Sequence, residues 1–408
     1  MSVKTSEPAL ARPSSAPVTR LIILGSSLTA LAVLRDAVRH GLEVLVLDVD
    51  VGPACASRWG RKIVRPGVGA NDLLPELLAE TGSHCALVAT SDYWLEFIMR
   101  HRVELEQACA EVLHPANAAL EACLHKELFV PRCCERGLPT PVTWFVGAET
   151  RPAGLLCPVI LRPLRTRHQG AHNELIPKAV EVPDEAALAR WLAVYSEQSC
   201  AAVASTSLLG RRLRQYSVAY ATPRSADRAA TFDLTQAFVT CKRRPLPDRC
   251  SVGTNVELSP QARVLELGRA VIEQLGLTGI GEIEVLHDVD TGENFVIEIN
   301  ARPWMQYALA PASGHDFFTT CVGAKLETSR TGLQRLQGRA WVEFKTDLLN
   351  AFPRRNGAVR RGEIGVARYL LSLLRANAIA RFRWHDRWPG MLGWRRAQRS
   401  GLLRSRLT

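Results

Sequence analysis

The stretch Gly281–Gln306, GEIEVLHDVDTGENFVIEINARPWMQ, decides how the rest of this chain is interpreted. Two runs of alternating apolar and polar residues, Glu282–Leu286 and Phe295–Ile299, flank an Asp- and Gly-containing turn at Asp288–Gly292. A period of two on either side of such a turn predicts a β-hairpin. The turn resembles a calcium-binding loop, but Gly292 lies one position early and the ligand series stops, so we exclude calcium.

Two carboxylates of the predicted hairpin face each other. Glu298 and Asn300 share one face of the second strand because alternate residues point the same way, and in a plausible register Glu284 lies opposite Glu298. Like charges opposed across a hairpin repel unless a cation lies between them. Two carboxylates and an amide are hard oxygen ligands that favour Mg²⁺ over a soft metal. The alternative interpretation is an ordinary exposed polar face followed by a solvated Arg302.

The same residues resemble a known motif. Glu284, followed by EINARPW from Glu298 to Trp304, resembles the metal-binding hairpin of the ATP-grasp superfamily, E-I-N-P-R, with Ala in place of the usual Pro. The resemblance implies that Glu284, Glu298 and Asn300 hold Mg²⁺ bridging the phosphates of ATP. It also implies that Arg302 stabilises charge on the transferred phosphoryl group or on an acyl phosphate. The continuation R-P-W-x-Q resembles the stand-alone carboxylate-amine ligases, which have a carbamoyl-phosphate synthase large-chain-like ATP-binding fold.

Upstream segments resemble other parts of this family in the expected order. His125-Lys126 followed by Gly137–Thr143 resembles D-K…G-I-P-T-P-x-T, which implies that Lys126 contacts a nucleotide phosphate, with His in place of the common Asp. Pro158–Pro163 resembles P-V-V-L-K-P, with Arg162 where a phosphate-binding Lys is usual. Arginine keeps the charge but is a wider, planar donor.

The remaining parts of the implied nucleotide site are less regular. Thr166–Ala171 corresponds to the flexible loop that covers the phosphates. The hinge that usually reads Q-E before a bulky residue is Ser205–Gly210 in this chain, so the resemblance implies that Thr206 and Leu208 lie next to the adenine. The family often has a further basic residue and a loop acid, which correspond to Lys242 and Glu257.

Short apolar strands alternate with helices in the first part of the chain, at Leu21–Leu24, Val44–Leu47 and Ala86–Val88, and predict a parallel sheet. Beyond them, we expect one long helix over Asp92–Ala110 and a largely helical Ala118–Arg136 that Pro131 kinks or interrupts.

The alternating strands and helices predict the α/β class, with lobes of α+β character, and the resemblance implies an ATP-grasp architecture. The expected divisions are a disordered leader (1–18), a Rossmann-like N-terminal lobe (19–115), a linker helix with a small lid lobe (116–210), a C-terminal ATP-grasp lobe with the metal-binding hairpin (211–330), and a linker with an Arg/Trp-rich tail (331–408).

Two rival signals are weaker. The segment Gly25–Ala30 after a strand, with Asp48 at the end of the next, suggests a Rossmann dinucleotide site, but only one of the three fingerprint glycines is present. We favour a Rossmann-like lobe that lines a substrate cleft. The adjacent Cys133 and Cys134 are expected to pack on a helix rather than to catalyse, since no His is placed to activate them.

Charge and cysteine usage bound the surroundings of the protein. The formal net charge is +11, and the segment from Ala351 to Thr408 holds 14 arginines, no lysine and two acids, so the body is close to neutral. The 11 cysteines show no metal or disulfide spacing, which suits a reducing, cytoplasmic compartment. No apolar run is long enough for a transmembrane helix.

The basic tail has apolar residues at helical spacing over Ile364–Phe382, followed by Trp384, Trp388 and Trp394 among arginines. One interpretation is a helix docked on the core. A second is peripheral attachment to an anionic surface on the inner face of the membrane, because Trp and Arg favour that interface. Nucleic acid ranks third and is not expected as a partner.

The function that this sequence favours is an ATP- and Mg²⁺-dependent carboxylate-amine ligase, which activates a small carboxylate as an acyl phosphate and transfers it to an amine. Bicarbonate is an alternative substrate. The third alternative is a degenerate ATP-grasp domain, acting as a non-catalytic binder or as a membrane-surface adaptor through its tail. Truncation near residue 350 would separate an adaptor from an enzyme. The identities of both substrates and the oligomeric state stay open.

Overall fold

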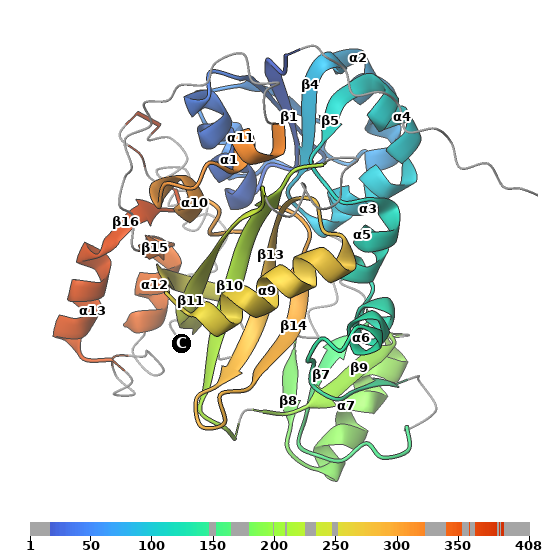
Figure 1. The fold of residues 1–408 in the computed structure, drawn as a ribbon, viewed down its shortest axis with the longest axis vertical. Helices are drawn as coiled ribbons and strands as arrows, with labels where there is room; N and C mark the ends of the chain where they lie inside the picture. The colour runs from blue at the N-terminus through green and yellow to red at the C-terminus, as the bar shows by residue number, and fades with distance from the viewer. Residues whose placement is uncertain are drawn as a thin grey trace, which may run out of the picture.

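The computed structural model describes residues 17–146, 152–164, 179–198, 200–208, 210–224, 234–246, 252–322, 340–352, 359, 364–381, 383 and 385–386. Most of the expected leader, the loop Thr166–Ala171, and Phe382, Trp384, Trp388 and Trp394 lie outside these ranges. Within them the chain forms three sheets, with the five-stranded parallel sheet at one end of the molecule and the small antiparallel sheet at the other (Figure 1). The α/β class expected from the sequence is confirmed.

The N-terminal lobe is the parallel sheet, in the order β3-β2-β1-β4-β5. Alternate residues of its central strands, such as Leu21 and Ile22, enter two separate apolar clusters, so helices cover both faces. Its elements are β1 (Arg20–Leu24), α1 (Leu28–Arg39), β2 (Glu43–Asp48), η1 (Pro53–Ala56), β3 (Arg61–Val64), η2 (Ala70–Leu73), α2 (Leu74–Glu80), β4 (Gly82–Ala89), α3 (Asp92–Arg100), α4 (Arg102–Ala108) and β5 (Cys109–Val112).

Two helix predictions in this region are wrong in their details. The single helix expected over Asp92–Ala110 is divided at His101, and the chain enters β5 at Cys109, because residues from Cys109 pair with β4. The second helical segment breaks at His125, between α5 (Asn117–Leu124) and α6 (Lys126–Glu135). Pro131 lies inside α6 without ending it. Strand pairing and the chain turn at His125 therefore override local helix preference.

The small middle lobe is an antiparallel sheet in the order β6-β9-β7-β8. One helix packs on it, through Leu188 and Tyr195, and closes a separate apolar core. Its elements are β6 (Thr143–Val146), β7 (Val159–Pro163), β8 (Val180–Val182), α7 (Glu185–Glu197) and β9 (Ala202–Thr206).

The largest sheet has the order β14-β13-β10-β11-β12-β15-β16. Helix α9 covers one face, and Gly268 allows this close approach, since a Cβ there would lie 2.6 Å from the Val218 side chain. The expected hairpin is confirmed, with Glu284 directly opposite Glu298. The elements are β10 (Leu213–Thr222), β11 (Gln236–Leu246), β12 (Val252–Leu258), α9 (Ala262–Leu275), β13 (Gly279–Asp288), β14 (Asn294–Asn300), α10 (Leu309–Ala312) and α11 (Phe317–Val322).

The C-terminal segment extends this sheet past the predicted boundary at residue 330. Strands β15 (Ala340–Val342) and β16 (Ala376–Ile379) form its edge, with α12 (Phe344–Ala351) and α13 (Val366–Leu374) beside them (Figure 1). The helix expected over Ile364–Phe382 therefore ends at Leu374, because the next residues pair in parallel with β15. None of the helices in the described ranges is long and apolar enough to cross a membrane.

Candidate active site

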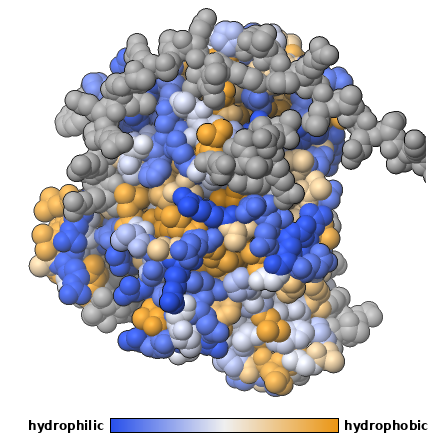
Figure 2. All heavy atoms as spheres, viewed as in Figure 1, coloured by the Kyte–Doolittle hydropathy of each residue, from blue (hydrophilic) through white to orange (hydrophobic). Residues whose placement is uncertain are grey.

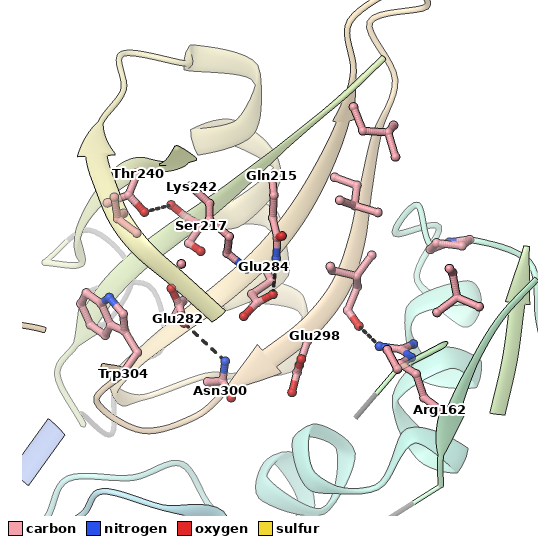
Figure 3. A pocket seen from close by; sticks show the side chains of 18 of the residues that line it. Arg162, Gln215, Ser217, Thr240, Lys242, Glu282, Glu284, Glu298, Asn300 and Trp304 are labelled. Atoms are coloured by element: carbon pink, nitrogen blue, oxygen red, sulfur yellow. Dashed lines mark hydrogen bonds between the residues drawn. The ribbon is translucent and has the colours of Figure 1, made fainter. Parts of the chain in front are cut away.

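A cavity of about 280 Å³ lies between the small middle sheet and the large sheet. On one side it is lined by residues of β7, β9 and the turn after β9, and on the other by residues of β10 to β14 and of the segment after β14 (Figure 3). Its floor is the face of the large sheet opposite α9, because side chains alternate between the two faces of each strand.

Strand register places a row of polar side chains across this floor. Glu298 pairs with Glu284, Glu284 with Ser217, and Ser217 with Thr240, so four neighbouring strands each contribute one member. The intervening residues, such as Ile283, are fully buried under α9. Alternation along the strands thus gives the sheet a polar face that lines the cavity and an apolar face that packs against α9.

The three predicted metal ligands are brought together at one end of this row. Glu284 accepts a hydrogen bond from Gln215 Nε2 at 2.6 Å, and the Asn300 amide oxygen accepts one from Arg302 Nη2 at 3.2 Å. Glu284, Glu298 and Asn300 all line the cavity. No three His, Cys, Asp or Glu side chains in the described part of the chain are grouped to hold a metal by themselves.

Two carboxylates and an amide nevertheless fit Mg²⁺. This ion usually takes one or two protein carboxylates and completes its shell with water and substrate phosphate oxygens. Glu284 and Glu298 would supply these carboxylate ligands from the protein. The cavity beside them leaves room for the phosphate oxygens that would complete the shell.

A third carboxyl, Glu282, was missed by the sequence analysis. It lies two residues before Glu284 on the same face of β13, and Asn300 Nδ2 donates to its Oε2 at 3.4 Å (Figure 3). Burial, together with the charge of Glu284, raises the pKa of Glu282 to about 7. The G-E-I-E pattern carried the signal, because alternate residues of a strand share a face and Glu282 therefore points the same way as Glu284.

Arg302 connects the hairpin to the N-terminal lobe. Its Nε donates to Asp92 Oδ1 at 2.6 Å, at the first turn of α3. Burial opposes the charge, but the carboxylate of Asp92 outweighs it and raises the pKa of Arg302. Arg302 therefore keeps a full positive charge at the cavity wall. Asp92 was not identified as a site residue from the sequence, because it lies some 200 positions away in the chain.

Lys126 is the first residue of α6 and lines a second, smaller cavity of about 20 Å³. Asp92, Glu298 and Asn300 also line that cavity. Since Glu298 and Asn300 belong to both linings, the two cavities adjoin at the hairpin. The structure thus brings Lys126 to the predicted metal ligands from a separate helix.

Arg162 reaches across from the small sheet to the hairpin. Its Nη1 donates to the carbonyl of Ile297 at 3.4 Å (Figure 3). Ile297 is the extra residue of a β-bulge, where the pairing passes from Glu298 directly to Val296. The buried Nε of Arg162 has no hydrogen-bond partner among the described residues. An unpaired buried donor of a cation facing a cavity suits an anionic ligand.

The two predicted adenine neighbours line the same main cavity. Thr206 ends β9, and Leu208 follows it, with Ile160 and Leu286 as apolar neighbours in the lining. All eight predicted site residues therefore line one or the other of the two adjoining cavities: Lys126, Arg162, Thr206, Leu208, Glu284, Glu298, Asn300 and Arg302.

The two further positions differ from each other. Lys242 lies on β11 and lines the main cavity. Glu257 is outside its lining and pairs with Arg243 at 2.8 Å. The structure thus places Lys242 with the site and Glu257 away from it.

The rival signals have structural explanations. Asp48 is 6% exposed and its carboxylate accepts a hydrogen bond from Trp94 Nε1 at 3.1 Å, so this carboxylate holds the packing of Trp94 and is not available to a ribose. Gly25 adopts a φ of 106°, and a Cβ there would meet Thr90 Oγ1 at 2.4 Å. Cys133 is fully buried, which raises the pKa of its thiol to about 12 and makes it a core residue. The packing expected for Cys134 is wrong, because this next residue of α6 points to the outside and is exposed.

No family model and no curated protein matches the chain at the sequence level. Solved structures do match the fold. An N5-carboxyaminoimidazole ribonucleotide synthetase in complex with ADP has a TM-score of 0.56 at 15% identity, covering 71% of this chain and 71% of that one. An L-amino acid ligase from Bacillus licheniformis has a TM-score of 0.56 at 16% identity, covering 77% and 75%.

A third match is the biotin carboxylase domain of the Hydrogenobacter thermophilus 2-oxoglutarate carboxylase, with a TM-score of 0.57 at 12% identity, covering 76% of this chain and 70% of that one. At these identities the likeness concerns the fold alone. It agrees with the three-lobe architecture expected from the hairpin, so the fold prediction is confirmed.

Proposed function

From the ATP-grasp fold of this chain we propose that it is an ADP-forming ligase, which joins a small carboxylate to an amine with ATP and Mg²⁺. The observation that carries the proposal is the pair of opposed carboxylates, Glu284 and Glu298, at the point where the two cavities meet. Three cations, Lys126, Arg162 and Arg302, approach this point from three different elements.

The residues divide into three roles. Bound Mg²⁺ would supply charge neutralisation on the phosphates, held by Glu284, Glu298 and Asn300. Lys126 and Arg162 would orient the phosphates, and the apolar surface beside Thr206 and Leu208 would take the adenine. This division supports ATP as the nucleotide, and two of the structural neighbours were solved with ADP or with ADP and magnesium.

In the proposed reaction the substrate carboxylate attacks the γ-phosphorus, forming an acyl phosphate and releasing ADP. An amine then attacks the acyl carbon, expelling phosphate and leaving an amide. Arg302 would stabilise the negative charge that develops on the transferred group, and its hydrogen bond to Asp92 fixes the guanidinium in place beforehand. Closure of the small lobe over the hairpin, which Arg162 already contacts, would exclude water from the acyl phosphate.

The degenerate-domain alternative is less well supported. A domain without catalysis has no use for two carboxylates facing each other over a cavity, since their repulsion destabilises the fold. A bicarbonate-using carboxylase stays a distinct outcome, because one structural neighbour is a biotin carboxylase domain.

The test is ADP release by the purified protein with Mg-ATP, in the presence of pooled amino acids, pooled small carboxylic acids, or bicarbonate. We expect one pool to stimulate ADP release and Glu298→Gln to reduce it by roughly 100-fold or more. Glu257→Gln is the matched control, because this carboxyl pairs with Arg243 outside the cavity and its loss should leave the rate unchanged.

Stimulation by bicarbonate alone would replace the amine ligase with a carboxylase. Equal rates for wild type and Glu298→Gln would refute the metal assignment. Absence of both ADP release and nucleotide binding would favour the degenerate-domain alternative.

A further inference from the structure

Helix α13 carries an apolar face that the fold leaves in solvent. Val366, Leu370, Leu371 and Leu374 are 50, 53, 56 and 84% exposed. Leu374 is the most exposed of the large apolar side chains in the described ranges. Scattered exposed apolar residues are ordinary, but several on one short helix form a patch of the kind that usually binds a partner.

The helix packs on the protein through a different face. Tyr369 is fully buried, stacks edge-on against Phe352 at 5.1 Å, and lies under the Arg244 guanidinium at 5.1 Å. At about 100° per residue, positions 366, 370, 374, 367 and 371 form one continuous arc beside Tyr369. The exposed leucines are therefore not an unfinished core contact, since the core-facing side of α13 is already filled.

Hydrogen bonds attach α13 to the large sheet and to α12. Ser372 accepts a hydrogen bond from Arg244 Nη1 at 2.8 Å, and Arg244 pairs with Asp347 of α12 through two contacts of 2.7 Å. Strand β16 begins two residues after α13 ends and pairs with β15. Figure 2 shows apolar atoms on the edge of the molecule over α13, next to strongly hydrophilic ones.

Arginines border this face. Arg368 and Arg375 are exposed and occupy the next sector of the helix, at the margin of the leucine arc. The sequence beyond Asp386, where the described part of the chain ends, contributes Trp388, Trp394 and six more arginines with no acid. On the described surface of α13, apolar and basic side chains thus lie side by side, and the sequence that follows continues the same composition.

The combination of exposed leucines and bordering arginines indicates which kind of partner binds this face. A second copy docked face to face with its α13 antiparallel would bring the arginine margins of the two helices onto the same side, which is unfavourable. A lipid surface with anionic headgroups takes up both features, because leucines enter the acyl boundary while arginines pair with phosphates. We propose that the α13 face, defined as Val366, Leu370, Leu371 and Leu374 with Arg368 and Arg375, docks on an anionic membrane surface.

Docking of the α13 face on a membrane would leave the candidate active site accessible. No residue of α13 lines either cavity. The proposal is independent of the proposed reaction, because it rests on surface residues that the reaction does not use.

The experiment is co-sedimentation of the full chain with vesicles of phosphatidylcholine alone or mixed in equal parts with phosphatidylglycerol. We expect binding only to the mixed vesicles and a decrease of about tenfold or more for the double variant Leu370→Glu/Leu374→Glu. Leu156→Glu is the matched control, because Leu156 is 72% exposed on the small lobe and should bind as wild type does. Unchanged thermal unfolding of the variants shows that they fold.

Equal vesicle binding by the wild type and the double variant would overturn the proposal, as would no vesicle binding at all. A dimeric wild type that the double variant converts to a monomer, seen by light scattering, would assign the face to a second copy instead. Retention of a DNA duplex in place of vesicles would likewise refute membrane docking.

Discussion

At the scale of single residues, the site depends on carboxylates whose surroundings differ. Glu284 is paired with Gln215, whereas Glu282 is buried beside it with a raised pKa. Alternation along each strand, together with the register of the hairpin, was enough to identify Glu284 and Glu298 from the sequence. Asp92 could not be found in this way, because its contact with Arg302 depends on how two lobes pack.

His40 provides a prediction for pH dependence. Burial alone would lower its pKa, but the hydrogen bond to Asp316 at 2.9 Å and the charge of Asp36 outweigh it and raise the pKa to about 8. A raised folded pKa stabilises the fold fully below the unfolded value near 6.5 and loses this stabilisation as the pH rises through 8. We expect the free energy of unfolding to fall by up to about 2 kcal/mol between pH 6 and 9 from this group.

The measurement is urea unfolding across that range for the wild type and His40→Gln, which keeps a polar side chain without a titration. The difference between the two proteins should shrink as the pH rises. A constant difference across the range would show that the protonated His40 does not stabilise the link between α1 and α11.

At the scale of elements, strand pairing ends helices that local preference would extend. The expected helix over Asp92–Ala110 ends where β5 pairs with β4, and α13 ends where β16 pairs with β15. In both cases the partner strand lies outside the helical segment, and the pairing has an irregular register. Periodicity within a short window of sequence therefore could not predict where these helices end. The hairpin was predicted correctly because its two strands and its turn lie within one window.

The contact between β11 and α12 is a testable element of this kind. Asp347 is 1% exposed and accepts from Arg244 Nε and Nη2 at 2.7 Å and from Thr254 Oγ1 at 2.8 Å. Removing one partner of a buried ion pair leaves the other charge uncompensated. Asp347→Asn should therefore lower the free energy of unfolding by about 3–5 kcal/mol.

Denaturant unfolding measures this loss. The double variant Arg244→Met/Asp347→Leu should recover much of it, because apolar side chains of similar volume carry no buried charge. A loss below about 1 kcal/mol for Asp347→Asn would contradict the assignment of a desolvated pair.

At the scale of the whole molecule, the C-terminal segment ties the lobes together. The carboxylate of Asp386 is fully buried and accepts from Arg35 Nε at 2.9 Å and Ser57 Oγ at 3.0 Å. Arg35 lies on α1 of the N-terminal lobe, whereas β16 belongs to the large sheet. A cut near residue 350 would therefore remove a strand, a helix and the partner of a buried arginine, rather than a separable tail.

We expect a chain ending at Asp386 to unfold cooperatively near the wild-type temperature, and a chain ending at Ala351 to be insoluble or to unfold well below it. The second chain leaves the edge of β15 unpaired and Arg35 buried without a counter-ion. The measurement is the unfolding temperature of both purified chains by calorimetry. A chain ending at Ala351 with wild-type stability would show that the Arg35–Asp386 link contributes nothing.

Sequence alone was sufficient to predict the features that depend on residues close together in the chain. It determined the hairpin, the face on which Glu284 and Glu298 lie, and the alternation of strands and helices in the first lobe, because side-chain direction follows directly from position along a strand. Only the tertiary structure decided which distant groups meet there. Lys126, Arg162 and Asp92 reach the hairpin from separate elements, and Arg35 meets Asp386 across most of the chain. Such contacts depend on how whole lobes pack, and no window of sequence contains that information.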